Sequence, residues 1–144
     1  MPLKTNRSMP RNALIPVLDY PDVPAAVAWL RKAFGFQERL RIGVHRAQLD
    51  AAGEGLVVMQ GAPTMADRSR FAVMVRVEDI ESHHRRSREA GARVVGPPTS
   101  YPYGERQYTV VDPWEHVWVF SETIADSDPA AWGGLLLEGD AGAA

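Results

Sequence analysis

Three groups of side chains in this sequence could bind a ligand or do chemistry. The first is the segment Tyr101-Pro-Tyr-Gly-Glu-Arg106 and then Tyr108. Tyrosine supplies ring area and a hydroxyl, glycine permits close approach, and arginine can stack or bind a carboxylate. These residues fit a lid over a pocket, with Tyr103, Arg106 and Tyr108 as ligand contacts, or a hairpin loop whose tyrosines only cover the core.

The second group surrounds a turn in VVDPWEHVWVF, residues 110–120. Asp112-Pro113 is typical of a turn, and Trp114 and Trp118 follow it four residues apart. We expect Trp118 in the core and Trp114 in contact with a ligand or partner. One histidine beside one glutamate makes no catalytic metal set, so we expect His116 to bond the backbone and orient the final strand.

The third group lies in strand-like runs and offers polar and flexible side chains to a cavity. Its members are Arg46, Gln48, Met59 and Met74. Both methionines are equally consistent with core filling. The enzymatic alternative is acid-base chemistry, which needs a buried carboxylate. Its candidate residues are Arg46, Gln48, Glu105, Arg106 and Glu115.

Composition excludes several classes of protein. The 144 residues, 45% hydrophobic and 24% charged, predict one globular domain. The absence of cysteine excludes thiolate chemistry, disulfides and cysteine-based zinc sites. No apolar run is long enough for a signal peptide or a membrane span, which predicts a cytoplasmic protein without a membrane partner.

The charge distribution argues against a nucleic-acid partner. No lysine or arginine follows Arg106, whereas seven acidic residues do. The basic run His83-His84-Arg85-Arg86-Ser87-Arg88 lies in a helical pattern and is expected to be a solvated helix face or edge.

The elements that must position these residues occur twice. Asp22 and Asp79 open amphipathic helices ended by Gly35 and Gly91, each preceded by a strand and followed by strands. The first strand is expected at residues 13–18. The helices repeat at an offset of 57 residues and the last strands at 61, which predicts an α+β fold of two βαβββ modules, at about 12–62 and 69–123.

This pattern resembles the vicinal oxygen chelate superfamily, which includes glyoxalase I, the bleomycin-resistance proteins and extradiol dioxygenases. Two segments carry the resemblance: VRVEDIESHHRRSREAGARVV and YGERQYTVVDPWEHVWVF. The second segment is similar to the PhnB-like branch. That branch has glycine where this chain has Glu115, which puts the conformation of the turn in question. The resemblance implies a curved, partly closed mixed sheet around a cavity.

Metal-using members of that superfamily place four ligands on the first and last strands of the modules. Here those places fall on Ile15, Val58, Ala72 and Val119. None of these side chains can ligate a hard metal, so no metal and no cofactor are predicted.

The leading hypothesis is therefore a protein that binds a small, planar or partly aromatic molecule in a metal-free cavity, as in antibiotic sequestration. The alternative is a lyase, isomerase or dioxygenase with a non-standard metal or acid-base site. A third is an interaction module that uses the acidic tail and Trp132. Because unpaired sheet edges are a liability, a homodimer is expected, with the modules paired edge to edge either within one chain or across that dimer. Residues 1–125 form the domain, and 126–144 a tail packed on the domain or a partner, with a frayed end.

Overall fold

Each helix begins at an aspartate, as the sequence predicts. Asp22 Oδ1 and Asp79 Oδ1 each accept a hydrogen bond of 3.1 Å from the backbone N–H three residues later. These caps satisfy donors that the first turn of a helix leaves without partners. The first helix ends at Gly35 with φ of 76°, a left-handed conformation that glycine adopts without strain.

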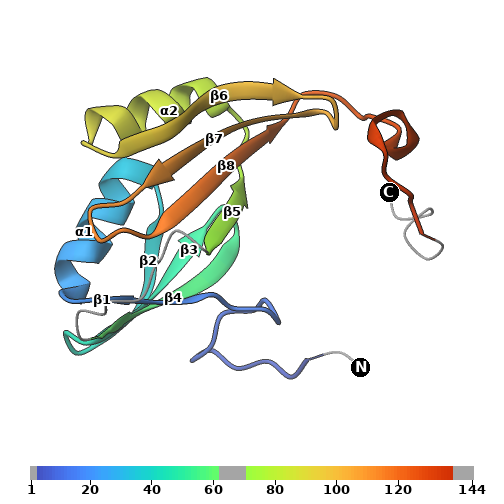
Figure 1. Ribbon diagram of the computed structural model, residues 1–144. Coiled ribbons are helices and arrows are strands. Elements are labelled where there is room, and N and C mark those ends of the chain that lie inside the picture. The colour runs from blue at the N-terminus through green and yellow to red at the C-terminus, as the bar shows by residue number, and fades with distance from the viewer. Residues whose placement is uncertain (1–2, 62–70, 138–144) are drawn as a thin grey trace.

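The computed structural model describes residues 3–61 and 71–137 and contains two βαβββ modules (Figure 1). The N-terminal module consists of β1 (Val17–Tyr20), α1 (Val23–Phe34), β2 (Gln37–Ile42), β3 (Arg46–Ala51) and β4 (Glu54–Gln60). The C-terminal module consists of β5 (Ala72–Arg76), α2 (Ile80–Glu89), β6 (Arg93–Tyr101), β7 (Glu105–Val111) and β8 (Val117–Thr123), and a short 3-10 helix, η2 (Pro129–Trp132), follows. The expected α+β class and the duplication are confirmed.

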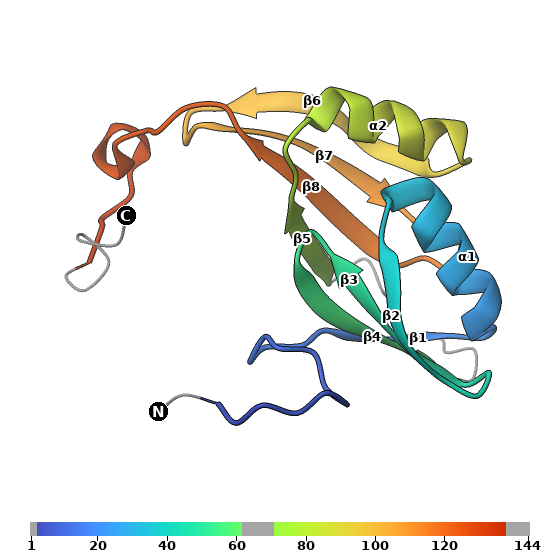
Figure 2. The ribbon, with the colours of Figure 1, turned by 180° about the vertical axis from the view of Figure 1, so that it is seen from behind.

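Each module has its own four-stranded sheet. The strand orders are β1-β4-β3-β2 and β5-β8-β7-β6, with the first pair of each sheet parallel and the others antiparallel. The helices α1 and α2 lie side by side on the same side of the molecule (Figure 2). Among the described strands, none of one sheet pairs with a strand of the other. Within the chain, the modules are therefore joined through their helix-covered faces.

The first strand begins later than the sequence predicts. We expected it at residues 13–18, but ladder pairing starts at Val17. Pro16 has no N–H to give to a ladder, although its carbonyl oxygen accepts a bond of 2.9 Å from Val57 N. Ile15 therefore precedes the strand.

Aromatic rings from both modules form one core. The Phe34 ring of α1 lies 5.5 Å from Trp118 and 4.8 Å from Phe120, both on β8, and Phe36 lies 5.4 Å from Trp118. Trp118 and Phe120 are fully buried, which confirms the core interpretation of Trp118. Each module thus covers the apolar face of the other.

One face of α2 also belongs to this interface, and it places His83, which was expected on a solvated helix face or its edge, in a half-buried position. His83 Nδ1 lies 2.6 Å from the Tyr108 hydroxyl, and Nε2 lies 3.2 Å from the Phe34 carbonyl oxygen. Arg86 donates from Nε and Nη2 to the carbonyls of Lys32 and Arg31, at 3.0 and 3.1 Å, at the C-terminal end of α1. The basic run in the sequence did not indicate this burial, because α2 packs against α1 as well as against its own sheet.

The turn between β7 and β8 links the modules through a buried aspartate. Asp112 Oδ2 accepts bonds from the Tyr20 hydroxyl at 2.7 Å and from Trp118 Nε1 at 3.2 Å. Its Oδ1 accepts from the backbone N–H groups of Trp114 and His116, both at 3.0 Å. His116 Nε2 lies 2.7 Å from the Asp19 carbonyl oxygen, which confirms the expected backbone bond of this histidine.

Glu115 adopts the conformation that glycine would take at this turn, with φ of 72°. Its carboxylate forms an exposed ion pair with Arg93 at 2.9 Å, and such pairs contribute little. We predict that Glu115→Gly is more stable than Glu115→Ala by about 1 kcal/mol, because both lose the ion pair and only alanine keeps the left-handed strain. Urea unfolding of both variants measures this, and equal stabilities would mean that the turn relaxes.

Candidate functional site

The candidate site is the face of the C-terminal sheet that points away from the helices, called here the open face. The strand register places Ala72, Val117 and Val111 in one row across this face, and Met74, Val119 and Thr109 in the next. Met74 is 59% exposed, although it lies in mid-strand. The centre of the open face is therefore an accessible apolar band.

A polar row borders this band. Arg76, Ser121 and Gln107 are register partners across β5, β8 and β7. Gln107 Nε2 donates to Ser121 Oγ at 3.0 Å, and Ser121 Oγ donates to Glu105 Oε1 at 2.7 Å. Arg76 donates to Thr123 Oγ1 at 2.7 Å. Charged and neutral polar groups thus lie along one side of the apolar band.

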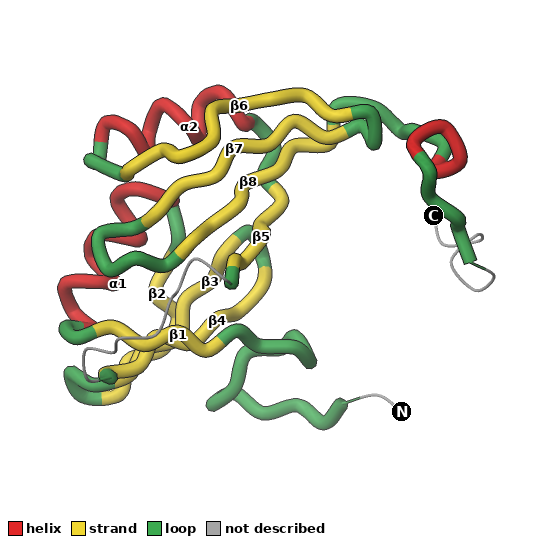
Figure 3. The backbone as a smooth tube through the Cα atoms, in the orientation of Figure 1, coloured by secondary structure: helices red, strands yellow, loops and turns green. Residues whose placement is uncertain are grey.

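Aromatic side chains close the same end of the sheet. The rings of Tyr101 and Tyr103 are stacked, 5.3 Å apart with an interplanar angle of 5°, and Trp132 of η2 meets Tyr103 edge-on at 5.5 Å. The segment that leads into the tail is held to the intervening turn, because Ile124 N donates to the Gly104 carbonyl at 2.8 Å. Figure 3 shows this tail beyond the end of the sheet. The end of the tail was predicted to be frayed, and its residues 138–144 lie outside the described residues.

The open face of the N-terminal sheet is partly covered by the chain's own N-terminal segment. Arg46 and Met59 are register partners on this face. Gln48 is only 4% exposed, because its amide donates to the Ser8 carbonyl at 2.8 Å and also bonds Arg39. A cavity of about 790 Å³ lies between this segment and Arg39. Of the predicted contacts on this face, Gln48 is covered by the N-terminal segment through its bond to Ser8. Arg46 and Met59 take no part in that bond.

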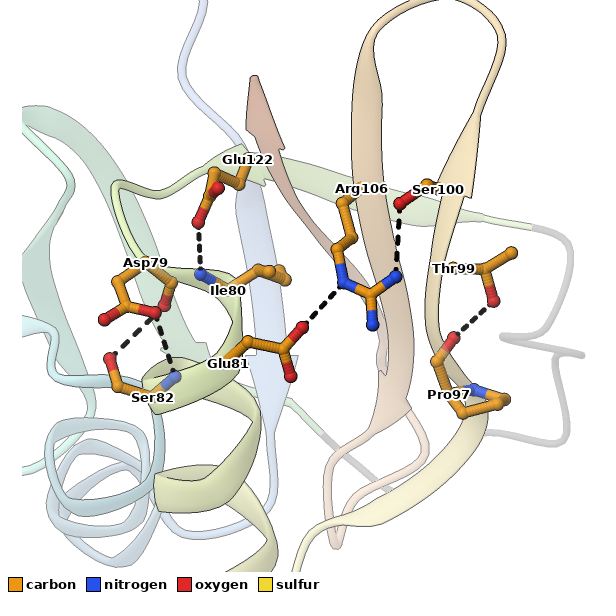
Figure 4. A network of polar contacts seen from close by, with 9 residues as sticks. All are labelled: Asp79, Ile80, Glu81, Ser82, Pro97, Thr99, Ser100, Arg106 and Glu122. Atoms are coloured by element: carbon orange, nitrogen blue, oxygen red, sulfur yellow. Dashed lines mark hydrogen bonds and ion pairs between the residues drawn. The ribbon is translucent and has the colours of Figure 1, made fainter. Parts of the chain in front are cut away.

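Three other predicted contacts lie away from the open face. Arg106 points to the helix side, where its Nε donates to Glu81 at 2.6 Å and its Nη1 to Ser100 at 3.1 Å (Figure 4). Tyr108 is 1% exposed and bonds Ser87 Oγ at 3.0 Å. Trp114 is half-buried, with its ring 5.3 Å from that of Tyr20. These residues position strands and turns beside the site.

Figure 4 also shows how the helix side of this region is built. Glu122, the register partner of Arg106, accepts a bond of 2.8 Å from Ile80 N at the start of α2. Residues 105–107 therefore alternate, with Glu105 and Gln107 on the open face and Arg106 facing α2. Three residues of the site were not predicted from the sequence: Arg76, Gln107 and Ser121. The period-2 alternation of β7 could have found Gln107, whereas Arg76 and Ser121 lie on other strands and have no local signal.

Burial shifts the pKa values of two side chains at the module interface. It lowers the pKa of His83 from 6.5 to about 4, and the nearby Arg86 charge acts in the same direction. Burial also raises the pKa of Tyr108 to about 12. Both groups are therefore neutral near pH 7.

The four places implied for metal ligands need one correction. Val58 is fully buried on the helix side of β4, so it cannot match Val119 on the open face. In the strand register Asp19 pairs with Met59 in the first module, and Arg76 pairs with Ser121 at the equivalent place in the second. The offset between the last strands of the two modules is therefore one residue larger than the sequence suggested. Val57, and not Val58, corresponds to Val119. The error arose because an apolar strand gives a similar sequence pattern in either register.

The corrected set does not fit a metal. Ile15, Val57, Ala72 and Val119 carry no oxygen, nitrogen or sulfur donor in their side chains. Over residues 3–61 and 71–137, no three histidine, aspartate or glutamate side chains gather closely enough to hold an ion. The side chains at these four places therefore cannot hold the metal that the resemblance implies.

Comparisons with known proteins fit this architecture. The model of the Glyoxalase/Bleomycin resistance protein/Dioxygenase superfamily matches residues 17–120. No curated protein matches the chain. In the described segments, no helix has the length and apolar character to cross a membrane.

Several solved structures share the fold. TioX from Micromonospora sp. ML1 is 34% identical, covering 81% of this chain and 100% of that one, with a TM-score of 0.66. A genomically encoded fosfomycin resistance protein, FosX, from Listeria monocytogenes is 16% identical over 77% of this chain and 92% of its own, with a TM-score of 0.65. On the family match and the identity to TioX, the chain belongs to the Glyoxalase/Bleomycin resistance protein/Dioxygenase superfamily.

Proposed function

We propose that this protein binds a small, flat, partly aromatic molecule on the open face of the C-terminal sheet, without a metal, and so sequesters it. The observation that carries the proposal is the accessible apolar band around Met74 and Val119, where metal-using relatives need ligands. Apolar area with a few polar groups at its margin is typical of small-molecule sites. Antibiotic sequestration is the form of this function that membership of the superfamily suggests.

We further propose that a second copy of the chain completes the site. The strands β1 and β5 each end a sheet and have one strand neighbour among the described strands. Val17 on β1 is 52% exposed and Met74 on β5 is 59% exposed. Pairing of these edges across a homodimer would remove open backbone groups from water and bring two open faces together.

Native mass spectrometry of protein purified without added metal or chelator tests both proposals. We expect a dimer, no divalent ion, and an organic mass that is lost on unfolding. One divalent ion per subunit would overturn the metal-free site, and a monomer would overturn the shared one.

A substitution in the apolar band provides the second test. We predict that Val119→Arg lowers affinity for the co-purified molecule by at least about tenfold, because it puts a charged side chain in the apolar band. Val44→Arg is the matched control, since Val44 is 71% exposed in the turn between β2 and β3. Equal affinity in both variants, measured by isothermal titration, would place the ligand elsewhere.

An enzyme is the second candidate, and the position of Glu105 favours it. This carboxylate lies on the open face within 2.7 Å of the Ser121 hydroxyl, so it could accept a proton from a bound substrate. A lyase or isomerase of this kind would lose turnover in Glu105→Gln but not on treatment with a chelator. A dioxygenase would lose turnover with the chelator.

A further inference from the structure

A directed chain of hydrogen bonds runs across the end of the open face. The Tyr103 hydroxyl donates to Gln107 Oε1 at 3.2 Å, Gln107 Nε2 donates to Ser121 Oγ at 3.0 Å, and Ser121 Oγ donates to Glu105 Oε1 at 2.7 Å. Each donor thus points toward Glu105. Bonds in such a series polarise one another, and the last, to a carboxylate, is charge-assisted.

This series of hydrogen bonds fixes the position of the Glu105 carboxylate and leaves it able to accept further hydrogen bonds. Because Gln107 uses its oxygen toward Tyr103 and its nitrogen toward Ser121, the orientation of its amide is set. Ser121 is 1% exposed, so its hydroxyl has little alternative to Glu105. Among the described residues, Glu105 Oε2 has no hydrogen-bond partner, and a carboxylate can accept several bonds. Glu105 is therefore a positioned acceptor.

An aromatic surface lies beside this acceptor. Tyr101 and Glu105 are register partners on β6 and β7, and side chains of such partners are neighbours on one face of a sheet. The Tyr101 ring stacks on Tyr103 and is 40% exposed. A flat ring that stacks on Tyr101 would therefore place a substituent near Oε2.

We propose that Tyr101 and Glu105 recognise a flat aromatic molecule that bears a hydroxyl or N–H donor. The ring lies against the tyrosine pair, and the donor bonds Glu105 Oε2. Recognition by a fixed acceptor rejects analogues that lack the donor, because the carboxylate then loses water without gaining a bond. This inference rests on the proposed function and adds the chemical class of the ligand.

Three coumarins that differ in one substituent test the inference. The probes are 7-hydroxycoumarin, 7-methoxycoumarin and coumarin-3-carboxylate, titrated into the full chain and followed by backbone amide NMR at slightly acidic pH. We expect the hydroxyl compound to bind about tenfold more tightly than the methoxy compound. The amides of β6, β7 and β8 should shift. Preference for the methoxy compound or the carboxylate would overturn the inference.

Variants assign the preference to Glu105. Glu105→Gln should weaken 7-hydroxycoumarin about tenfold and leave 7-methoxycoumarin within about twofold. Glu115→Gln is the control, because that carboxylate pairs with Arg93 in an exposed turn at the opposite end of β7. Tyr101→Leu should weaken both coumarins alike. If Glu105→Gln does not fold, Ser121→Ala replaces it and should weaken the hydroxyl compound about threefold.

The outcomes separate this inference from the proposed function. Equal binding of the hydroxyl and methoxy compounds to the wild type, with shifts on the open face, refutes Glu105 as the recognition group and leaves the binding function standing. If no coumarin shifts these amides, the inference fails. An organic mass in the native spectrum would then still support sequestration.

Discussion

Asp112→Ala is expected to destabilise the protein by about 3–5 kcal/mol, which is more than the loss expected for any of the other variants. The substitution removes the acceptor of four hydrogen bonds at a site that is 2% exposed. It leaves the hydroxyl of Tyr20 and the indole N–H of Trp118 buried without that acceptor. Urea unfolding followed by tryptophan fluorescence measures the loss.

Two further variants show whether the effect comes from this network. Asp112→Asn keeps one acceptor oxygen and should lose about 2 kcal/mol. Asp126→Ala changes an exposed aspartate in the tail and should fall within about 0.5 kcal/mol of the wild type. A loss below about 1 kcal/mol in Asp112→Ala would show that the turn does not hold the modules together.

Acidification is expected to destabilise the protein through His83. The folded-state pKa of about 4 lies below the ordinary value of 6.5, so between these values the unfolded chain binds the proton and the folded chain does not. Stability therefore falls as pH decreases from about 6.5 to about 4 and then levels off. The two values limit the loss to about 3 kcal/mol.

The contribution of His83 is isolated by comparing unfolding free energies at several pH values in the wild type and in His83→Leu. Carboxylates titrate in the same window, but they do so in both proteins. We expect the variant to lose less stability than the wild type on acidification. His45→Leu, an exposed histidine in the turn between β2 and β3, should follow the wild-type curve. Parallel curves for His83→Leu and the wild type would assign the acid sensitivity to other groups.

Much of the fold could be predicted because its signals are local. The caps at Asp22 and Asp79 need only the next three residues, and the duplication needs only two similar stretches. The buried Trp118 and the backbone bond of His116 also followed from the turn sequence. These predictions depend on short-range geometry that a sequence carries directly.

The site was harder to predict because it depends on which face of a strand meets the helices. In β7, both Arg106 and Gln107 are polar, and only pairing with β8 puts Arg106 toward Glu81 on α2. The one-residue error at Val58 has the same origin, since an apolar strand reads alike in either register. Residues that act together on the open face, such as Tyr101 and Ser121, come from separate strands and have no local pattern.

The aromatic interface between the modules makes each half of the chain dependent on the other. Phe34 and Phe36 come from the first half of the chain, whereas Trp118 and Phe120 come from the second. A half-length chain would expose its share of these rings to water and would self-associate to cover them. A single βαβββ unit would therefore be stable only as a pair, and joining two such units in one chain makes that association permanent.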